Sequence, residues 1–268
     1  MKNNDTLIES NKNAWATLAK THYNTYYKLI KTGNLTLNPL VEKELGDIKG
    51  KKVLHLQCNT GADTIYLAQK GAIITGVDIV EENIHYAKKL AKLANVEARF
   101  IASDILTLLD IHQETYDIIM TTDGVLGWIP DLNKWGKIVK TLLKPEGFVY
   151  IHDSHTFMMI FDEKALDKGT LIPKYPYFDL TPDKDDFIGG YASNAKPAEN
   201  YYWGHAIETI LNGLINNDLY LTYFKEHPRC VPGMGGCKKD QAGLSYYPEL
   251  DGKLPLVFSL KAKKFVLK

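Results

Sequence analysis

The chain has 268 residues, the length of one large α/β domain or of a domain with an inserted cap. Its 32 Lys and Arg residues balance 32 Asp and Glu residues, which argues against a nucleic-acid or membrane-surface partner. The three cysteines, Cys58, Cys230 and Cys237, lack a zinc spacing, so we expect reduced thiols in a cytoplasmic protein without a metal site. No apolar run approaches the roughly 20 residues of a membrane span.

Residues 5–30 predict one amphipathic helix. Apolar and aromatic side chains recur along one face at helical spacing, at Trp15, Leu18, Ala19, His22, Tyr23 and Tyr26. This face either packs on the core or closes over a ligand as a lid. A loop over 33–39 and a short helix over 40–45 then lead to the first strand.

The stretch from Val53 to Asp78 predicts a strand, a tight turn, a helix and a second strand. Both strands are short apolar runs, as expected in a parallel sheet that is buried on both faces. We expect the Thr60 hydroxyl to cap the helix and Gly71 to end it. The N–H groups of the turn and the Asp78 carboxylate at the strand tip would then meet a nucleotide ligand, with Asp78 accepting from the ribose hydroxyls.

The turn favours a cofactor without a pyrophosphate, because a dinucleotide fold would need the glycine series G-x-G-x-x-G and Gly61 alone remains. The stretch resembles motifs I and II of class I S-adenosylmethionine-dependent methyltransferases, whose first strand ends D/E-x-G-x-G-x-G. Here the acid falls on His55 and the three glycines on Gln57, Asn59 and Gly61. Asn tolerates positive φ, so Asn59 is compatible with the turn. The letters LQCNTG resemble a branch of mostly uncharacterised bacterial enzymes.

The resemblance also implies cofactor contacts after the third strand, which we expect over 98–101. In the family an acid here accepts the adenine amino group and the next apolar residue flanks the ring, which assigns these roles to Asp104 and Ile105. A plain turn cap is the alternative role for Asp104. The full implied cofactor set is Gln57, Cys58, Asn59, Gly61, Asp78, Ile79, Ser103, Asp104, Ile105 and Thr122, with Trp15 and His22 from the N-terminal helix.

The fourth strand is predicted over 116–120, and in the family the loop after it faces the methyl group. DNA amino-methyltransferases carry D/N/S-P-P-Y/F/W there, whereas this chain has Thr121-Thr122-Asp123-Gly124, and it also lacks a Pro-Cys nucleophile. Both differences disfavour DNA substrates. The following run LLKPEGFVYIHD closely resembles the helix, L-K-P-G-G turn and fifth strand of the family.

Residues 153–200 are irregular, and we interpret about 157–200 as an insertion that caps the substrate site. Its aromatic residues form either a satellite core or a pocket for an apolar substrate: Tyr175, Tyr177, Phe178, Phe187 and Tyr191. A helix from Trp203, strand six over 219–224, an excursion over about 228–252 and strand seven over 254–261 complete the chain.

These elements predict an α/β fold with a doubly wound, seven-stranded, mostly parallel sheet. It is Rossmann-like, as in the methyltransferases, with strand seven antiparallel and an inserted cap. We expect a helical lid over 1–49 and the methyltransferase domain over 50–268.

The predicted function is transfer of a methyl group from S-adenosylmethionine to a small-molecule acceptor at an O, N or C atom. A general base is needed only for an acceptor that arrives protonated. The catalytic candidates are His155 first, then His205 and Asp123, while His152 is expected to turn into the sheet. Substrate contacts are expected from Trp128, Tyr191 and Trp203.

Two alternatives stay open at this point. A protein or RNA methyltransferase would show an exposed basic groove beside the cofactor. A non-catalytic S-adenosylmethionine-binding protein would have a site that is sealed against any acceptor. Nothing in the sequence indicates the oligomeric state.

Overall fold

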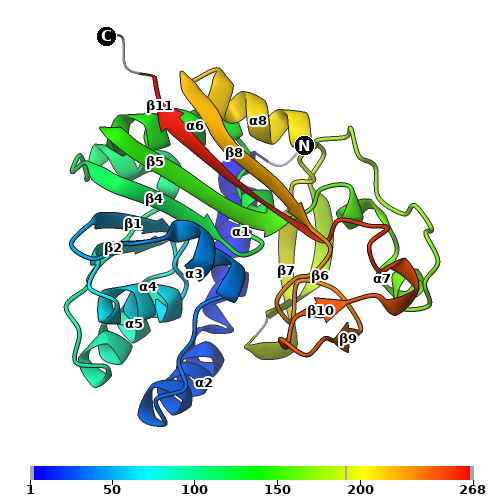
Figure 1. Ribbon diagram of the computed structural model, residues 1–268, viewed down its shortest axis with the longest axis horizontal. Coiled ribbons are helices and arrows are strands. Elements are labelled where there is room, and N and C mark those ends of the chain that lie inside the picture. Colours follow the sequence, from blue (N-terminus) through cyan, green and yellow to red (C-terminus); the bar gives the residue numbers. More distant parts are fainter. Residues whose placement is uncertain (1–2, 191, 266–268) are drawn as a thin grey trace.

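A seven-stranded sheet forms the centre of the fold in the computed structural model, which describes residues 3–190 and 192–265 (Figure 1). The strand order is β3-β2-β1-β4-β5-β11-β8. The strands are β1 (Lys52–Leu56), β2 (Ile73–Asp78), β3 (Arg99–Ala102), β4 (Tyr116–Thr122), β5 (Leu143–Ser154), β8 (Leu219–His227) and β11 (Val257–Lys264). Strands β1 to β5 are parallel, and β11 runs antiparallel to both β5 and β8. The predicted fold class is confirmed.

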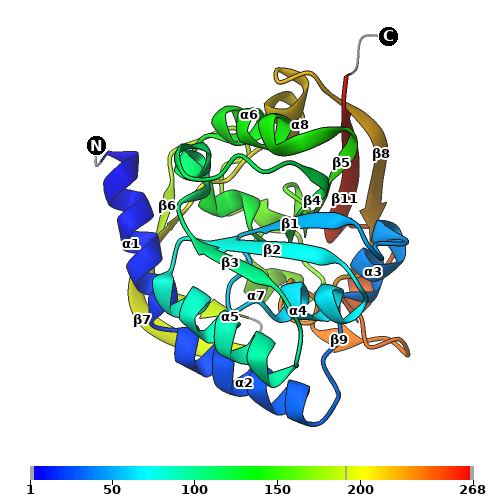
Figure 2. The ribbon, with the colours of Figure 1, turned by 90° about the vertical axis from the view of Figure 1, so that its left-hand side faces the viewer.

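Helices cover both faces of the sheet (Figure 2). One face carries α3 (Pro39–Leu45), α4 (Ala62–Gln69) and α5 (Glu81–Leu93). The other carries the 3-10 helix η1 (Ile105–Asp110) with α6 (Leu132–Leu142) and α8 (Ile207–Ile215). Successive strand residues point to opposite faces, so Val53 joins the cluster under α3 and Leu54 the cluster under α6. This double burial explains the unbroken apolar runs of the central strands.

Helices α6 and α8 approach each other closely through glycine. A Cβ atom added at Gly136 would lie 1.9 Å from the carbonyl oxygen of Gly213, well inside van der Waals contact. Gly213 in turn faces the carbonyl oxygen of Leu132, at 2.8 Å from its own added Cβ. The two helices therefore pack backbone to backbone.

The N-terminal segment forms two helices, α1 (Asn4–Ala16) and α2 (Ala19–Lys31), so the prediction of one helix over 5–30 is wrong. The Thr17 hydroxyl donates to the carbonyl of Ala14 at 2.7 Å, and the Leu18 N–H donates to Trp15 at 3.0 Å. Such local bonds compete with the regular helical ladder. The break lets α2 lie along α5, where Tyr23 stacks on Tyr86 at 4.7 Å between ring centroids.

The segment between β5 and α8 contains η3 (Met158–Ile160), α7 (Glu163–Leu166) and an antiparallel hairpin of β6 (Asp183–Gly190) and β7 (Ser193–Tyr202). Strand β7 lies beside α1 (Figure 2). The Asn11 amide donates to the Tyr201 carbonyl at 2.8 Å, and its oxygen accepts from the Tyr201 N–H at 2.7 Å. One buried side chain thus joins two elements that are far apart in the sequence.

The excursion before β11 contains β9 (Lys238–Lys239), β10 (Ser245–Tyr246) and η4 (Pro248–Leu250). It shares a small apolar core with η3 and α7, formed by Met158, Phe161, Leu166, Cys230, Met234, Tyr247, Leu250, Leu254, Leu256 and Val257. The sequence predicted other aromatic residues in such a core or pocket, and for two of them this is wrong: Phe178 is 80% exposed and Phe187 57%. Among the described helices, none is long and apolar enough to cross a membrane.

Candidate active site

The turn after β1 keeps a left-handed backbone at three alternate positions. The φ angles are +56° at Gln57, +50° at Asn59 and +77° at Gly61, the three positions aligned above with the motif glycines. The left-handed conformation is least favourable at Gln57, because it costs a residue with a long side chain roughly 1–2 kcal/mol of conformational free energy. Its side chain holds the turn: the amide donates to the Val125 carbonyl at 3.1 Å, and the Thr121 hydroxyl donates to its oxygen at 3.4 Å.

The start of α4 differs from the prediction. Gly61 is the N-cap residue and no side chain caps the helix, so the expected Thr60 cap is wrong. The Thr60 hydroxyl oxygen is buried and has no hydrogen-bond partner within the described residues. A Cβ at Gly61 would come within 2.8 Å of the Phe100 ring, and this crowding adds to the need for glycine.

Asp78 ends β2 beside this turn and is 7% exposed. Its carboxylate accepts from the backbone N–H groups of Asn59 at 2.8 Å and Val80 at 3.0 Å, and from the Asn83 amide at 3.1 Å. Burial raises the pKa of Asp78, although these three hydrogen bonds act in the opposite direction. A carboxylate offers about four acceptor positions, so one remains for a ligand hydroxyl.

A cavity of about 860 Å³, counting its open mouth, lies along the carboxyl ends of β1 to β4. Helix α1 supplies one wall through Ile8, Asn11, Lys12 and Trp15. Eleven of the predicted site residues line it: Trp15, Gln57, Asn59, Asp78, Ile79, Ser103, Asp104, Ile105, Thr122, Asp123 and Trp128. The volume is typical of a small-molecule site.

Two lining residues each have a buried polar atom without a hydrogen-bond partner among the described residues, which indicates a ligand. Asn83 Oδ1 and Thr122 Oγ1 are buried, and neither has a hydrogen-bond partner in the described part of the chain. Buried polar atoms are normally satisfied, so a bound polar molecule would remove this penalty. Asp104, meanwhile, caps η1 by accepting from the Leu106 N–H at 2.8 Å, while still lining the cavity.

Three predicted cofactor residues lie behind the cavity wall. Cys58 is 4% exposed and packs under the turn. Gly61 caps α4 as described. His22 is fully buried, and its ring nitrogens bond to the side chains of Asn59 at 3.0 Å and Ser193 at 3.1 Å, so it braces the turn against the start of β7.

The predicted catalytic histidines, His155 and His205, do not line the cavity, and neither does the predicted substrate residue Trp203. Tyr191 lies outside the described residues. His155 Nε2 bonds to Glu226 at 2.8 Å, and its Nδ1 accepts from the Phe157 N–H at 3.2 Å. His205 Nε2 donates to the Ile129 carbonyl at 2.8 Å. Burial lowers the pKa of both histidines. Trp203 packs in a small cluster with Leu7.

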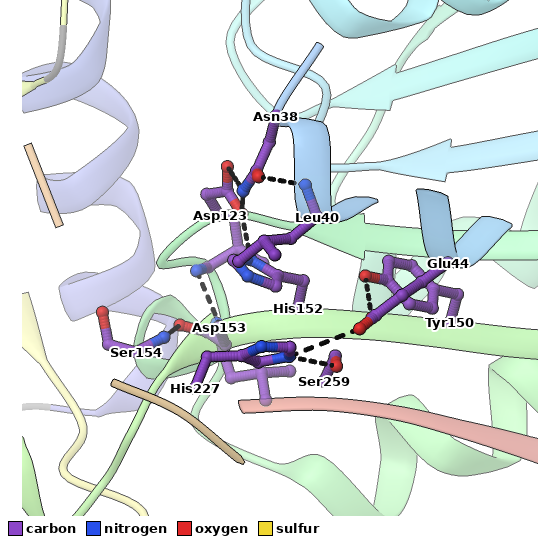
Figure 3. Close-up of polar contacts among 12 residues, drawn as sticks. Asn38, Leu40, Glu44, Asp123, Tyr150, His152, Asp153, Ser154, His227 and Ser259 are labelled. Atoms are coloured by element: carbon purple, nitrogen blue, oxygen red, sulfur yellow. Dashed lines mark hydrogen bonds and ion pairs between the residues drawn. The ribbon is translucent and has the colours of Figure 1, made fainter. Parts of the chain in front are cut away.

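The end of β5 carries two residues that the sequence interpretation did not select. Asp153 is 2% exposed and accepts from the N–H groups of Val125 and Leu126 at 3.0 and 2.8 Å, which fixes the loop after β4. His152 turns inward, as predicted, and its Nδ1 hydrogen-bonds to Asp123 Oδ1 (Figure 3). The run His152-Asp153 at a strand end was the available signal, but it does not tell which side chain points where.

Two asparagines were also missed. Asn83 interrupts the apolar face of α5, and a polar residue at such a position is a signal that the spacing rule can detect. Asn38 caps α3 and donates to Asp123 across 85 residues of sequence, which no local pattern reveals.

The fold and this cavity define a class of enzyme. The model of the family described as "Methyltransferase domain" matches residues 47–205, more than half of the chain. The chain therefore belongs to this family and carries a methyltransferase domain.

Among curated proteins, the chain is similar to the ubiquinone biosynthesis O-methyltransferases of Shewanella sp. (strain ANA-3), at 29% identity, and of Vibrio campbellii, at 30%. These matches cover 57% and 62% of this chain. They span just under two thirds of the relatives' own length, 65% and 66%.

Solved structures share the fold. A candidate S-adenosylmethionine-dependent methyltransferase from Listeria monocytogenes superposes with a TM-score of 0.59 at 19% identity, covering 91% of this chain and 99% of that one. An S-adenosylmethionine-dependent methyltransferase from Mesorhizobium loti gives 0.56 at 15% identity, covering 84% and 96%.

Proposed function

We propose that this chain transfers a methyl group from S-adenosylmethionine to the oxygen of a small-molecule acceptor. The observation that carries the proposal is the continuous cavity wall that runs from Asp78, at the end of β2, and Asp104, after β3, to Asp123 and Trp128, after β4. The named activity of the O-methyltransferase relatives supports oxygen as the acceptor atom.

The cofactor fits the first part of this wall. Asp78 would accept a hydrogen bond from a ribose hydroxyl, and Asp104 one from the adenine amino group. Ile79 and Ile105 would flank the ring. The cofactor supplies an activated methyl group on a sulfonium, so the chain needs chiefly to hold the acceptor in line with it and to exclude water.

Two features favour a small acceptor over a protein or RNA. Helix α1 covers the cavity, and β7 backs α1 through the two Asn11 bonds. The lining contains three carboxylates and, within the described residues, one cation, Lys12, which pairs with Glu81 at 2.9 Å. This lining is the opposite of a basic groove, and electrostatic attraction to a polyanion would require one.

Trp15 and Trp128 give the acceptor end its shape. Their rings meet edge to face at 5.3 Å between centroids, and the Trp128 N–H donates to the Gly124 carbonyl at 3.0 Å, which fixes the indole. Val125 and Ile129 extend this apolar wall. Such a surface suits a flat, largely apolar compound that carries one or a few hydroxyl groups.

The test is calorimetric titration with S-adenosylmethionine, S-adenosylhomocysteine and NADH, followed by transfer of labelled methyl groups to a panel of hydroxylated aromatic compounds. We expect micromolar binding of both adenosyl compounds, no binding of NADH, and label in an ether product. Absence of adenosyl binding would refute the proposal, and label appearing in amines or in RNA instead would refute the acceptor class.

Asp78→Ala sharpens the assignment of the ribose contact. Loss of a charge-assisted hydrogen bond should weaken S-adenosylhomocysteine binding about tenfold or more. Asp110→Ala, an exposed site on η1, is the matched control and should bind like the wild type. Equal affinity in both variants would show that Asp78 does not hold the ribose.

A further inference from the structure

Asp123 is the cavity-facing end of a buried polar network (Figure 3). Its side chain is 13% exposed, whereas the His152 side chain behind it is fully buried. His152 Nδ1 hydrogen-bonds to Asp123 Oδ1, and the Asn38 amide donates to Oδ1 and Oδ2 at 3.4 and 3.2 Å. These contacts orient the carboxylate and leave it able to accept a further hydrogen bond from a molecule in the cavity.

The other ionisable residues of the lining are engaged differently. Asp78 and Asp104 accept from backbone N–H groups beside β2 and β3, and Lys12 pairs with Glu81. Among the four ionisable residues of the described lining, Asp123 alone is backed by an imidazole, which holds the carboxylate in place. It also stands at the end of β4, beside the Trp128 wall.

The hydrogen bonds of the His152 ring determine where a further proton would be held. Nε2 is buried and has no hydrogen-bond partner in the described residues. When Asp123 is a carboxylate it can only accept, so His152 Nδ1 donates in the bond between them. A proton taken from a molecule in the cavity would therefore be held on Asp123 itself.

A second carboxylate lies on the far side of the network. The His152 ring centroid is 6.2 Å from that of His227, whose Nε2 is 3.4 Å from Glu44. Burial disfavours the charged form of Glu44, but hydrogen bonds from Ser259 and two tyrosines outweigh it and lower the Glu44 pKa. Burial lowers the pKa of His227 in spite of this neighbouring carboxylate.

We propose that Asp123 is the general base for an acceptor that arrives as a neutral hydroxyl, and that His152 positions Asp123. This inference rests on the proposed function. Asp123 takes the hydroxyl proton while the hydroxyl oxygen bonds to the methyl carbon. The carbon–sulfur bond breaks with its electron pair going to sulfur. The positive charge of the sulfonium is thus replaced by one proton on Asp123, and an ether and a neutral thioether result.

The first test measures which ionisation state of a phenol the site accepts. The probe is p-nitrophenol, titrated into protein saturated with S-adenosylhomocysteine, with the neutral and ionised absorbance bands followed as the pH rises. Asp123 should hold the neutral form, because a phenolate beside a carboxylate is repelled. In Asp123→Asn the ionisation midpoint of the bound probe should fall by about one pH unit, a tenfold change in equilibrium. Equal midpoints, or no binding of the probe to the wild type, would overturn the proposal.

The second test separates positioning from mere structural support. His152→Asn keeps an N–H donor near the place of Nδ1, whereas His152→Leu removes it. We expect His152→Leu to weaken binding of neutral p-nitrophenol several-fold and His152→Asn to restore most of it. Equal affinity in wild type and His152→Leu, or equal losses in the two variants, would contradict the role of His152.

Cofactor affinity distinguishes this inference from the function on which it rests. If Asp123 is a base, Asp123→Asn should bind S-adenosylmethionine and S-adenosylhomocysteine as the wild type does. A selective loss of S-adenosylmethionine would instead make Asp123 the counter-charge of the sulfonium and overturn its role as base. Failure of the wild type to bind either compound would refute the proposed function itself.

Discussion

Asp153 fixes the loop that forms part of the acceptor wall. Besides the N–H groups of Val125 and Leu126, it accepts from the N–H of Ser154 at 2.6 Å. Burial raises the pKa of its carboxyl to about 6, although those three donors act in the opposite direction. The folded protein therefore holds this proton more tightly than the unfolded chain, whose ordinary value is 3.8.

This raised pKa predicts how stability responds to pH. The Asp153 contribution should favour folding more as the pH falls from about 7, with the gain accumulating down to the unfolded value near 4. Asp153→Asn should lose this pH dependence and be less stable at about pH 7 by roughly 1–3 kcal/mol, because the amide cannot satisfy all three donors. Denaturant unfolding of both proteins at about pH 7 and about pH 5 measures the difference.

The control for this experiment is Asp110→Asn, an exposed carboxylate on η1. It should keep the wild-type change in stability between the two pH values. An unaltered pH dependence in Asp153→Asn would mean that the Asp153 proton is not coupled to folding.

At this residue scale the sequence identified the carboxylates more readily than their partners. Asp78 and Asp123 are predicted from their places at strand ends, since parallel strand ends meet at one edge of a sheet, and Asp104 is implied by the family resemblance. His155 was ranked above His152, because no local pattern tells that Asn38 and Asp123 meet around His152. Pairings across the chain depend on tertiary packing, which residue spacing does not encode.

Helices α6 and α8 illustrate what an element contributes. Their contact at Gly136 and Gly213 brings two backbones together, so the next strand, β8, reaches the edge of the sheet beside β11. The sequence predicted both helices from their apolar stripes. It predicted one helix over 5–30 just as firmly and was wrong there, since the stripe continues through the turn at Thr17.

Gly136→Ala tests the close helix contact. The new methyl group would overlap the Gly213 carbonyl, so α8 must shift away. We expect a loss of about 1–3 kcal/mol in the free energy of unfolding, even though alanine is the better helix former. Gly204→Ala, with open space around its added Cβ, should be close to neutral in the same thermal or denaturant melt. Equal stability of both variants would show that the helices can separate without cost.

The whole molecule closes its cavity with parts from distant regions of the chain. Helix α1 lies over the strand ends, β7 lies beside α1, and His22 braces the turn after β1 against the start of β7 (Figure 2). The sequence predicted a seven-stranded, mostly parallel sheet and an inserted segment, and it placed the insertion's aromatic residues in either a satellite core or a pocket. The structure uses the backbone of β7 instead, through Asn11.

Asn11→Ala tests whether this closure controls the exchange of ligand. It removes both buried bonds to Tyr201 and should weaken the contact between α1 and β7 by about 1–3 kcal/mol. We expect S-adenosylhomocysteine to dissociate about tenfold faster and backbone amides over 193–202 to exchange hydrogen faster. Asn13→Ala, exposed on the same helix, is the matched control. Unchanged dissociation from Asn11→Ala would mean that α1 does not move when the ligand leaves.

The turn at Gln57, Asn59 and Gly61 shows that a left-handed backbone can be present where the expected glycine residues are not. The turn is left-handed at all three positions although two of them are not glycine, because Gln57 is tied to the loop after β4 and asparagine tolerates the conformation. A lineage can therefore drift away from glycine here one residue at a time without losing the turn. In distant chains, three alternate positive φ angles after the first strand would mark this site where no glycine pattern survives.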